Sequence, residues 1–238
     1  MAAAESQEPL CSGSEGPREA SVIIPTYNGL RYLGDCLRSV FHEVGSGDEV
    51  VVVDNASGDG SPDFVARHYP DAILVRNAEN RGFAGACNQG ARLACGQILV
   101  FLNQDTRVEP GWLEALVRGL EDGPAVGLTT SKVLLMPHPD RIHLCGQHVH
   151  YTGLVFGRGY GESADSLNED SDVNAVSGAS FAIRRELWEN LDAFDETFYM
   201  YYEETDLSWR AQLAGYRCRY LHTSLAYHDY DPTTPGFS

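Results

Sequence analysis

The sequence is short of positive charge, of long apolar runs and of paired cysteines. Its 238 residues carry 17 Lys and Arg against 34 Asp and Glu, a net charge of −17. This balance argues against a nucleic-acid binder and against attachment to anionic lipid through a basic patch. No apolar run approaches the ~20 residues that a membrane helix needs, so we predict no transmembrane segment. The six cysteines form no CxxC pair, which favours reduced thiols and a cytoplasmic location.

The first 18 residues differ in character from the rest of the chain. They are small, polar and acidic, and they lack the basic start and apolar centre of a signal peptide. We therefore predict a disordered tail at 1–18. The hydrophobic content of 43% is enough for one large α/β domain in the remainder.

Apolar strand-like and helix-like segments alternate from Ala20 to about Thr130. The patterns predict strands at 21–25, 49–53, 72–76, 97–102 and 125–130, and helices at 29–41, 61–68, 83–95 and 110–121. Such alternation is typical of a mostly parallel sheet with helices on both faces. After Thr130 the rhythm changes to a predicted hairpin within 143–160, a strand at 173–183, and helices at 185–191 and 204–214. We therefore predict an α/β fold with a small antiparallel C-terminal part.

Two carboxylates follow predicted strands directly. Asp54 ends VVVD and Asp105 ends LVFLNQD, and the carboxyl ends of strands in an open α/β sheet form the ligand crevice. Asp54 can accept a hydrogen bond from a nucleotide base or ribose, or it can cap the next helix. Asp105 is placed to hold Mg²⁺ or Mn²⁺, which takes one or two carboxylates plus phosphate oxygens and waters. A plain turn residue is the alternative for Asp105.

Two other stretches have the chemistry to contact a nucleotide. Pro25, Thr26 and Asn28 end the first strand and can hold a pyrimidine ring and its ribose, or Asn28 can simply cap a turn. Asn80 and Gly82 open NRGFAGACNQG, where free backbone N–H groups at a helix start favour a phosphate. The stretch is no GxGxxG fingerprint, which disfavours a dinucleotide-binding dehydrogenase. Glycines required for helix packing are the alternative.

The acidic start of the last predicted helix supplies candidates for a general base. Glu203 and Glu204 follow an aromatic run, and adjacent helical positions diverge by about 100°, so one can face a cleft while the other points away. Apolar and acidic neighbours would raise the pKa of the cleft-facing carboxyl toward a range useful for a base. Asp206 and Arg210 are spaced i,i+4 and can form an ion pair. A solvated acidic helix start is the alternative.

A competing metal hypothesis comes from the segment HLCGQHVH. It contains His143, Cys145, His148 and His150, which are zinc-ligand residue types. On a strand, His148 and His150 share a face and Cys145 points elsewhere. No second cluster completes a tetrahedral set with zinc-finger spacing. We therefore favour a packing or surface role for this segment.

Taken together, the ordered stretches resemble glycosyltransferase family two, the inverting enzymes with a GT-A nucleotide-diphospho-sugar-binding fold. The likeness runs from about Ser21 to His228 and is carried by SVIIPTYNG, VVVDNASGDGS, NRGFAGACNQG, LNQDT with PGWL, VSGASFAIRRELW and FDETFYMYYEETDLSWR. Within the family, the chain looks closest to the rhamnosyltransferase-like branch, which builds bacterial surface polysaccharide or cell-wall linkers.

The resemblance implies a role for each candidate residue. The nucleotide would contact Thr26, Asn28, Asp54 and Asn80. Asp105 would be the retained acid of the DxD-type metal motif, whose first position is Asn103 here, and His228 would complete the metal's coordination. Glu204 falls where the family usually has a catalytic Asp, and its extra methylene moves the carboxylate outward by about 1.5 Å. Glu203 is the alternative base.

The function implied by the resemblance is inverting sugar transfer from a UDP- or dTDP-sugar, dTDP-rhamnose among them, to a hydroxyl of a glycan or lipid-linked glycan. Residues 19–130 would form the nucleotide-sugar-binding half of the domain and residues 131–238 the acceptor-binding and catalytic half. We expect a cytoplasmic location, with peripheral association at the inner face of the cell membrane as a further option. A catalytically degenerate nucleotide-sugar-binding module is the main alternative. A nucleotidyltransferase would want a basic glycine-rich loop after the first strand, where this chain has Pro25-Thr26-Tyr27.

Overall fold

The computed structural model describes residues 19–230, so the predicted disordered tail at 1–18 lies outside the described residues. Six α-helices and one 3-10 helix occur in this range: α1 Leu30–Glu43, α2 Ser61–His68, α3 Gly82–Leu93, α4 Trp112–Leu120, α5 Arg185–Asn190, η1 Glu196–Phe198 and α6 Glu203–Leu213. The strands are β1 Ala20–Thr26, β2 Glu49–Asp54, β3 Ile73–Arg76, β4 Ile98–Leu102, β5 Thr106–Val108, β6 Val126–Leu135, β7 Ile142–Leu144, β8 Gln147–Val149, β9 Val155–Gly157, β10 Ser171–Val173, β11 Ser180–Arg184 and β12 Arg217–His228.

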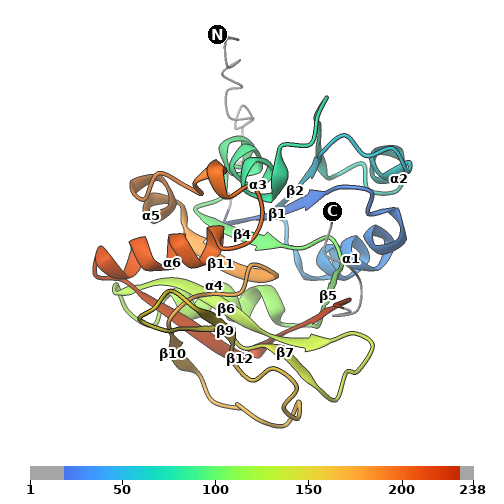
Figure 1. The fold of residues 1–238 in the computed structure, drawn as a ribbon. Helices are drawn as coiled ribbons and strands as arrows, with labels where there is room; N and C mark the ends of the chain where they lie inside the picture. The colour runs from blue at the N-terminus through green and yellow to red at the C-terminus, as the bar shows by residue number, and fades with distance from the viewer. Residues whose placement is uncertain (1–18, 231–238) are drawn as a thin grey trace.

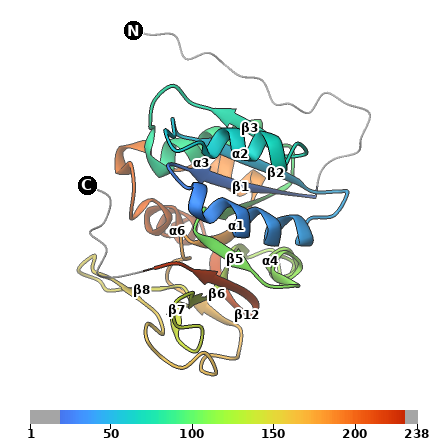
Figure 2. The same cartoon turned by 90° about the vertical axis from the view of Figure 1, so that its right-hand side faces the viewer.

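One large mixed sheet runs through the molecule in the order β10-β12-β6-β11-β4-β1-β2-β3. The pairs β1–β2, β1–β4, β2–β3 and β6–β12 are parallel, whereas β11 runs antiparallel to both of its neighbours. Both views place β1 and β2 in the upper half of the molecule and β6, β7 and β12 in the lower half (Figures 1 and 2). The predicted α/β fold, with a mostly parallel sheet and a small antiparallel part, is confirmed.

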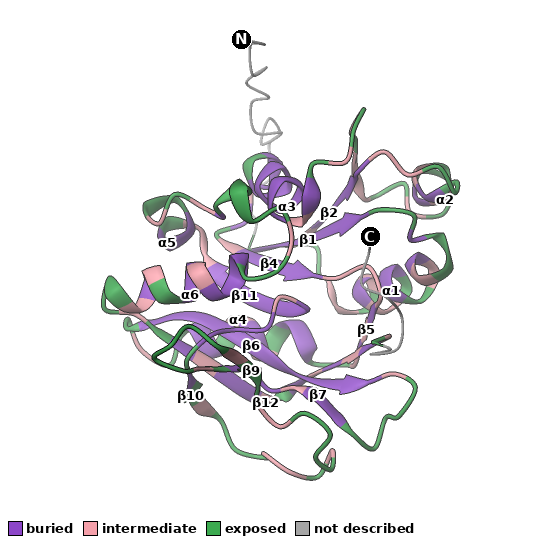
Figure 3. Ribbon diagram, in the orientation of Figure 1, coloured by how far each residue is buried: buried purple, intermediate pink, exposed green. Residues whose placement is uncertain are grey.

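The period of two along the strands divides the core into two layers. In β1, Ile23 packs on one face of the sheet with residues of α3, α5 and α6. Its neighbours Val22 and Ile24 pack on the other face with residues of α1, α2 and α4. The strands of the central sheet are buried, and the exposed residues gather on the outer loops and helix surfaces (Figure 3). The sheet is therefore covered by helices on both faces, as predicted.

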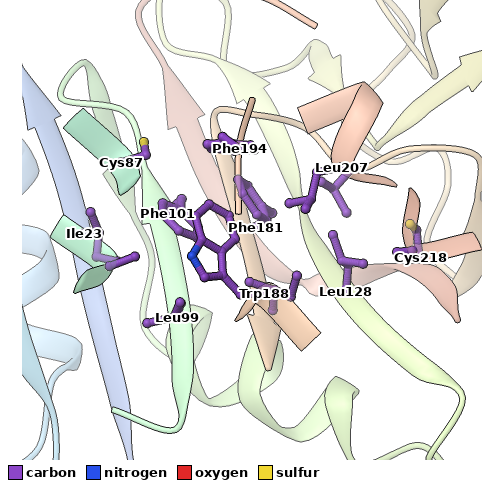
Figure 4. Packing of buried hydrophobic residues seen from close by; sticks show 14 of the residues in the cluster. Ile23, Cys87, Leu99, Phe101, Leu128, Phe181, Trp188, Phe194, Leu207 and Cys218 are labelled. Atoms are coloured by element: carbon purple, nitrogen blue, oxygen red, sulfur yellow. The ribbon is translucent and has the colours of Figure 1, made fainter. Parts of the chain in front are cut away.

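Aromatic rings fill the first core layer where α5 meets the sheet. Phe101 of β4 stacks on Phe181 of β11 with centroids 4.9 Å apart, and Trp188 lies 4.7 Å from Phe101. Phe194 meets Trp188 edge-on at 4.9 Å, so the four rings form one cluster (Figure 4). These contacts hold the loop after α5 against the sheet, and that loop leads through η1 to α6.

The observed boundaries of the N-terminal helices and strands agree closely with the predicted ones. Those of the C-terminal half differ from the prediction. The helix predicted at 61–68 is found at Ser61–His68. The strand predicted at 173–183 is found as two short strands, β10 Ser171–Val173 and β11 Ser180–Arg184. The long strand at Arg217–His228 was not predicted. That strand carries a register shift between Leu221 and Leu225, and this irregularity breaks the alternation that identifies a strand from its sequence.

Within the described residues, four cysteines are buried free thiols, namely Cys36, Cys87, Cys145 and Cys218. The prediction of reduced thiols is confirmed for these four cysteines. It is not confirmed for Cys95. No helix within residues 19–230 combines the length and the apolar character required to cross a membrane.

Candidate active site

The ends of β1 and β2 bring Thr26 and Asp54 side by side. These residues are direct partners in the parallel pairing, and the N–H of Asn55 donates to the carbonyl of Thr26 at 2.8 Å. Asp54 is 2% exposed; its Oδ2 accepts from the N–H of Ser57 at 3.1 Å, while its Oδ1 is buried without a partner. A buried, unpaired carboxylate oxygen is costly. Asp54 is therefore well suited to accept a hydrogen bond from a bound ligand.

The loop after β4 is fastened to the end of β1 by Gln104. Its Oε1 accepts from the hydroxyl of Thr26 at 2.5 Å and from the N–H of Tyr27 at 3.0 Å, and its Nε2 donates to the carbonyl of Tyr27 at 3.2 Å. Pro25 lies one position earlier, opposite Val53. The link fixes the position of the loop that carries Asp105. The Thr26 hydroxyl is engaged by protein here, and its contact with a nucleotide stays a prediction.

Asn28 and Asn80 both serve local turns. Asn28 has a positive φ of 49°, and its Oδ1 accepts from the N–H of Gly58 at 2.9 Å. The Oδ1 of Asn80 accepts from the N–H of Gly82 at 2.9 Å, just before α3. These bonds shape the loops after β1 and β3. Nucleotide contacts by either side chain remain predictions.

Gly82 is explained by a close backbone contact. Its φ is +75°, and a Cβ at this position would lie 2.5 Å from the carbonyl oxygen of Tyr199. The same oxygen accepts from the N–H of Ala84 at 3.2 Å. The segment before α6 therefore reaches the first turn of α3, where a phosphate was predicted to bind. That phosphate contact stays a prediction, and the packing alternative has direct support.

Asp105 and His228 meet although 123 residues separate them. Asp105 lies in the turn between β4 and β5, and His228 pairs with Thr106 of β5 at the end of β12. His228 Nε2 is 3.1 Å from Asp105 Oδ1, and the N–H of Asp229 donates to the carbonyl of Asp105 at 2.9 Å. The missed strand β12 therefore delivers the predicted second metal ligand to the first.

This pair fits a divalent cation that is shared with a phosphorylated ligand. A carboxylate oxygen and an imidazole nitrogen face each other at a common edge of the sheet. Within residues 19–230, no group of three or more His, Cys, Asp or Glu is arranged to hold a metal ion by itself. Mg²⁺ and similar divalent cations need few protein ligands when phosphate oxygens and waters complete their coordination shell. Asp105 and His228 would be those ligands.

Behind His228 lies His143, which the sequence had offered only as part of a zinc alternative. The two Nδ1 atoms are 3.1 Å apart, and the ring of Tyr230 stacks on His143 with centroids 4.4 Å apart. Burial, together with His228, lowers the pKa of His143 to about 3. Cys145 is buried and His148 is exposed, so the members of the zinc hypothesis do not converge.

Glu203 and Glu204 are both buried at the start of α6, with exposed fractions of 4% and 8%. This burial contradicts the alternative of a solvated acidic helix start. Burial, reinforced by the charge of Glu204, raises the pKa of Glu203 to about 8. Burial also raises the pKa of Glu204 above its ordinary value. Each carboxyl keeps one oxygen, Oε2, buried and without a protein partner.

Contacts connect Glu204, rather than Glu203, to the pair of Asp105 and His228. A Cβ on Gly178 would lie 3.4 Å from Glu204 Cδ, and the N–H of Asn103 donates to the carbonyl of Ala179 at 3.1 Å. The segment before β11 thus connects Glu204 to the turn that holds Asp105. Glu203 instead acts on Cys87 of α3, whose pKa is raised by burial and then by that charge.

The segment that leads into α6 is strained. Tyr199, Tyr201 and Tyr202 have positive φ values of 58°, 72° and 72°, a region that non-glycine residues rarely occupy. Tyr201 and Tyr202 are also exposed, at 60% and 54%. Strain of this kind persists where the surroundings enforce it, often beside functional groups. The backbone of these tyrosines determines where α6 begins, at Glu203.

Asp206 and Arg210 form the predicted i,i+4 ion pair, at 2.6 Å. Arg210 also donates to the carbonyls of Leu191 and Ala193, the latter at 2.9 Å. These bonds tie α6 to the loop after α5. The contacts give Asp206 and Arg210 a structural role. A role of either residue in acceptor binding stays a prediction.

Two cavities lie apart from this cluster. One of about 700 Å³ lies between α4 and β12 and is lined by Glu114, Arg118, Asp122 and Asp170 among others. Another of about 290 Å³ lies beside β10 and is lined by His148, Gln212 and Arg217 among others. Neither is lined by a residue that was predicted to bind the nucleotide, hold the divalent cation or act as the base. The polar contacts, rather than the hollows, identify the site.

Comparison with known proteins gives a consistent result. The family model described as Glycosyl transferase family 2 matches residues 21–192. The "Pre-mycofactocin glycosyltransferase" of Mycobacterium tuberculosis is 30% identical over 218 residues, which cover 90% of this chain and 43% of that protein. GalNAc-T7, solved with UDP, GalNAc and Mn²⁺, matches with a TM-score of 0.74 at 19% identity, over 91% of this chain and 44% of that one. The mannosyltransferase PcManGT from Pyrobaculum calidifontis, solved with GDP-Man and Mn²⁺, has a TM-score of 0.68 at 24% identity, over 93% and 59%.

The fold is thus that of the GT-A class of nucleotide-diphospho-sugar transferases. The chain belongs to glycosyl transferase family 2, whose model covers most of the described residues. The chain spans less than half the length of the mycobacterial relative.

Proposed function

We propose that this protein is an inverting glycosyltransferase that uses a nucleotide-diphospho-sugar donor and Glu204 as its general base. The observation that carries the proposal is the state of the Glu204 carboxyl. One oxygen is held by Gln147 at 2.8 Å, the other is buried without a partner, and burial raises the pKa. A carboxylate prepared in this way is a good proton acceptor near neutral pH.

The proposed reaction is a single displacement. The acceptor hydroxyl gives its proton to Oε2 of Glu204 while its oxygen forms a bond to the anomeric carbon. The bond from that carbon to the diphosphate breaks on the opposite side, which inverts the anomeric configuration. A divalent cation held by Asp105 and His228 would neutralise the charge that develops on the leaving diphosphate. Asp54, with its unpartnered Oδ1, accepts a hydrogen bond from the nucleotide.

For the donor, the cation and the acceptor we propose chemical classes rather than single compounds. We assign residues 19–130 to nucleotide-sugar binding and 131–238 to acceptor binding and catalysis. UDP- and dTDP-sugars are the proposed donors, with dTDP-rhamnose among them, and Mg²⁺ or Mn²⁺ is the proposed cation. A glycan or lipid-linked glycan of polysaccharide or cell-wall synthesis is the proposed acceptor. We further propose a cytoplasmic location, with peripheral association at the inner face of the membrane as an option.

The first experiment identifies the donor. Thermal unfolding is followed with a panel of UDP- and dTDP-sugars, with and without Mn²⁺, because a ligand that binds the folded state raises its stability by mass action. A true donor should raise the melting temperature more when Mn²⁺ is present. The same mixtures are then assayed for hydrolysis of the sugar nucleotide, which separates a working transferase from a degenerate binding module.

The second experiment tests the base. Glu204→Gln should reduce transfer or donor hydrolysis by about 10²–10⁴-fold, the usual contribution of a general base, and should leave donor binding intact. Glu203→Gln is the matched variant, one position away on the same helix and equally buried. Near wild-type hydrolysis by Glu204→Gln would show that the base has been assigned to the wrong residue.

A further inference from the structure

The segment Ile142–Val149 contacts both parts of the proposed site. It forms β7 and β8 with a tight turn between them, where Gly146 has a φ of +80°. His143 and Gln147 are buried, with exposed fractions of 6% and 9%. His148, which follows Gln147, is exposed. Each of the two buried polar side chains is hydrogen-bonded to a proposed site residue, His143 to His228 and Gln147 to Glu204. Neither forms or breaks a bond in the proposed reaction.

The contact between the two histidines restricts their protons. With Nδ1 atoms 3.1 Å apart, one ring must donate a hydrogen and the other must accept it, since two donors or two acceptors would repel. In the contact with Asp105 Oδ1, a carboxylate oxygen that can only accept, Nε2 of His228 carries the proton. When a cation takes the place of that contact, the Nε2 lone pair faces the cation and the proton of His228 lies on Nδ1. His143 must then accept it through its own Nδ1. Outer partners of this kind fix the tautomer and the ring orientation of metal-binding histidines.

The ring of His143 is itself held in place. Tyr230 stacks on it at an interplanar angle of 22°, and Ile142, the preceding residue, pairs with Leu134 of β6. A fixed ring offers its acceptor in one direction. His228 is thereby held in the orientation that directs Nε2 toward Asp105.

Gln147 performs the equivalent task for Glu204. Its Nε2 donates to Glu204 Oε1 at 2.8 Å, and its Oε1 accepts from the hydroxyl of Thr205 at 2.8 Å. The hydroxyl contact fixes which end of the amide faces the carboxylate. The N–H of Gln147 donates to the carbonyl of Ala175 at 2.8 Å, so its backbone is anchored as well. One oxygen of Glu204 is held, and the other is left unpaired.

We infer, on the basis of the proposed function, that residues 142–149 are the positioning element of the site: His143 orients His228 toward the cation, and Gln147 orients Glu204 toward the acceptor hydroxyl. Both residues act through another residue and touch neither substrate nor cation. The two halves of the site are thereby held in register by one short piece of chain.

The cation side is tested by Mn²⁺ affinity, measured calorimetrically with and without UDP. His143→Phe keeps a ring for Tyr230 to stack on but removes the acceptor, and we expect Mn²⁺ binding to weaken by about 10–100-fold. His143→Gln restores an acceptor and should recover most of the affinity. His148→Asn, an exposed histidine of the same segment 142–149, is the control. Urea unfolding of each variant separates lost affinity from lost folding. Wild-type affinity in a folded His143→Phe overturns the inference.

The base side is tested by the pH profile of sugar-nucleotide hydrolysis. Gln147→Met removes a donor to the charged form of Glu204, so the acid limb of the profile should move upward by about one pH unit. The titratable groups that face this position are Glu203 on the same helix and Cys87 of α3 beyond it, and both are present in every variant. Gln212→Met is the control, because Gln212 bonds only the carbonyls of Asn174 and Ser208 in the described contacts.

The outcomes separate the inference from the proposed function. If the wild-type protein binds Mn²⁺ and hydrolyses a sugar nucleotide, while His143→Phe and Gln147→Met behave like it, the positioning role is refuted and the proposed function stands. If the wild-type protein does neither, the proposed function fails first. Reduced Mn²⁺ affinity only in the His143 variant, with a shifted pH profile only in the Gln147 variant, supports the inference.

Discussion

Replacing Glu203 with Gln should stabilise the protein relative to wild type as the pH rises from 5 to 8. Burial and the charge of Glu204 raise the pKa of Glu203 from 4.5 to about 8. In the unfolded chain the pKa returns to its ordinary value, so the folded state holds a proton that the unfolded chain has already released. The resulting stability is fully present below the unfolded pKa and is lost as the pH rises through the folded pKa.

The magnitude follows from the two pKa values. Integrating the difference in bound protons between pH 5 and pH 8 gives a loss of about 3 kcal/mol. For a domain of this size, 1 kcal/mol corresponds to about 2–4 °C in Tm. The glutamine variant cannot lose this stability, so its Tm relative to wild type should increase by about 6–12 °C across the interval.

The contribution of His143 to the free energy of unfolding has the opposite pH dependence. It must be removed by comparing two proteins that both contain His143. Its pKa is lowered from 6.5 to about 3 by burial and by His228, so its contribution is present above the unfolded pKa and is lost as the pH falls. Both proteins contain His143, and its effect disappears from their difference. Urea unfolding at pH 5, 6, 7 and 8 measures that difference, with Glu186→Gln, an exposed glutamate of α5, as control. A difference between wild type and Glu203→Gln that is constant or shrinks with pH would refute the reasoning.

Three further predictions concern the framework of the site. Trp112→Phe should cost about 1–3 kcal/mol in urea unfolding, because two buried serine hydroxyls lose the indole N–H that donates to them at 2.8 and 3.1 Å. Gly82→Ala should lower the Tm and the donor hydrolysis rate together, since its Cβ would meet the carbonyl of Tyr199; Gly215→Ala, with a similar φ and open space around it, should cost only the backbone strain of about 1–2 kcal/mol. Arg210→Lys should free the loop after α5, which limited proteolysis would detect as faster cleavage there; unchanged cleavage would contradict the role assigned to its carbonyl contacts.

The sequence predicted the parts of the site that depend on local patterns. Asp54 and Asp105 follow apolar strands, and the carboxyl end of a strand is a defined place in a parallel sheet. The i,i+4 pair of Asp206 and Arg210 is equally local and was found as predicted. In each of these cases a periodic pattern within a few residues carries the information.

Contacts between distant segments were not predictable in the same way. Gln147 and Glu204 are 57 residues apart, and His143 and His228 are 85 residues apart. No local pattern links either pair. Strand β12, which brings His228 to Asp105, was itself hidden because the shift at Leu221/Leu225 interrupts its alternation. The composition of the histidine segment offered only a zinc alternative, which we did not favour, and nothing in it indicated the contact of His143 with His228 on another strand.

The unpaired polar atoms argue that the site is built for a ligand. In residues 19–230, six buried side-chain oxygens have no hydrogen-bond partner, and four of them belong to Asp54, Asn103, Glu203 and Glu204. Buried polar atoms are normally paired, because an unpaired one costs about 1–3 kcal/mol. A fold that leaves four such atoms unpaired, at the end of β2, after β4 and at the start of α6, is less stable than it could be. Local rules of this kind are broken mainly at functional sites. In the proposed function, hydrogen-bond donors of a nucleotide and an acceptor hydroxyl would supply partners for such oxygens.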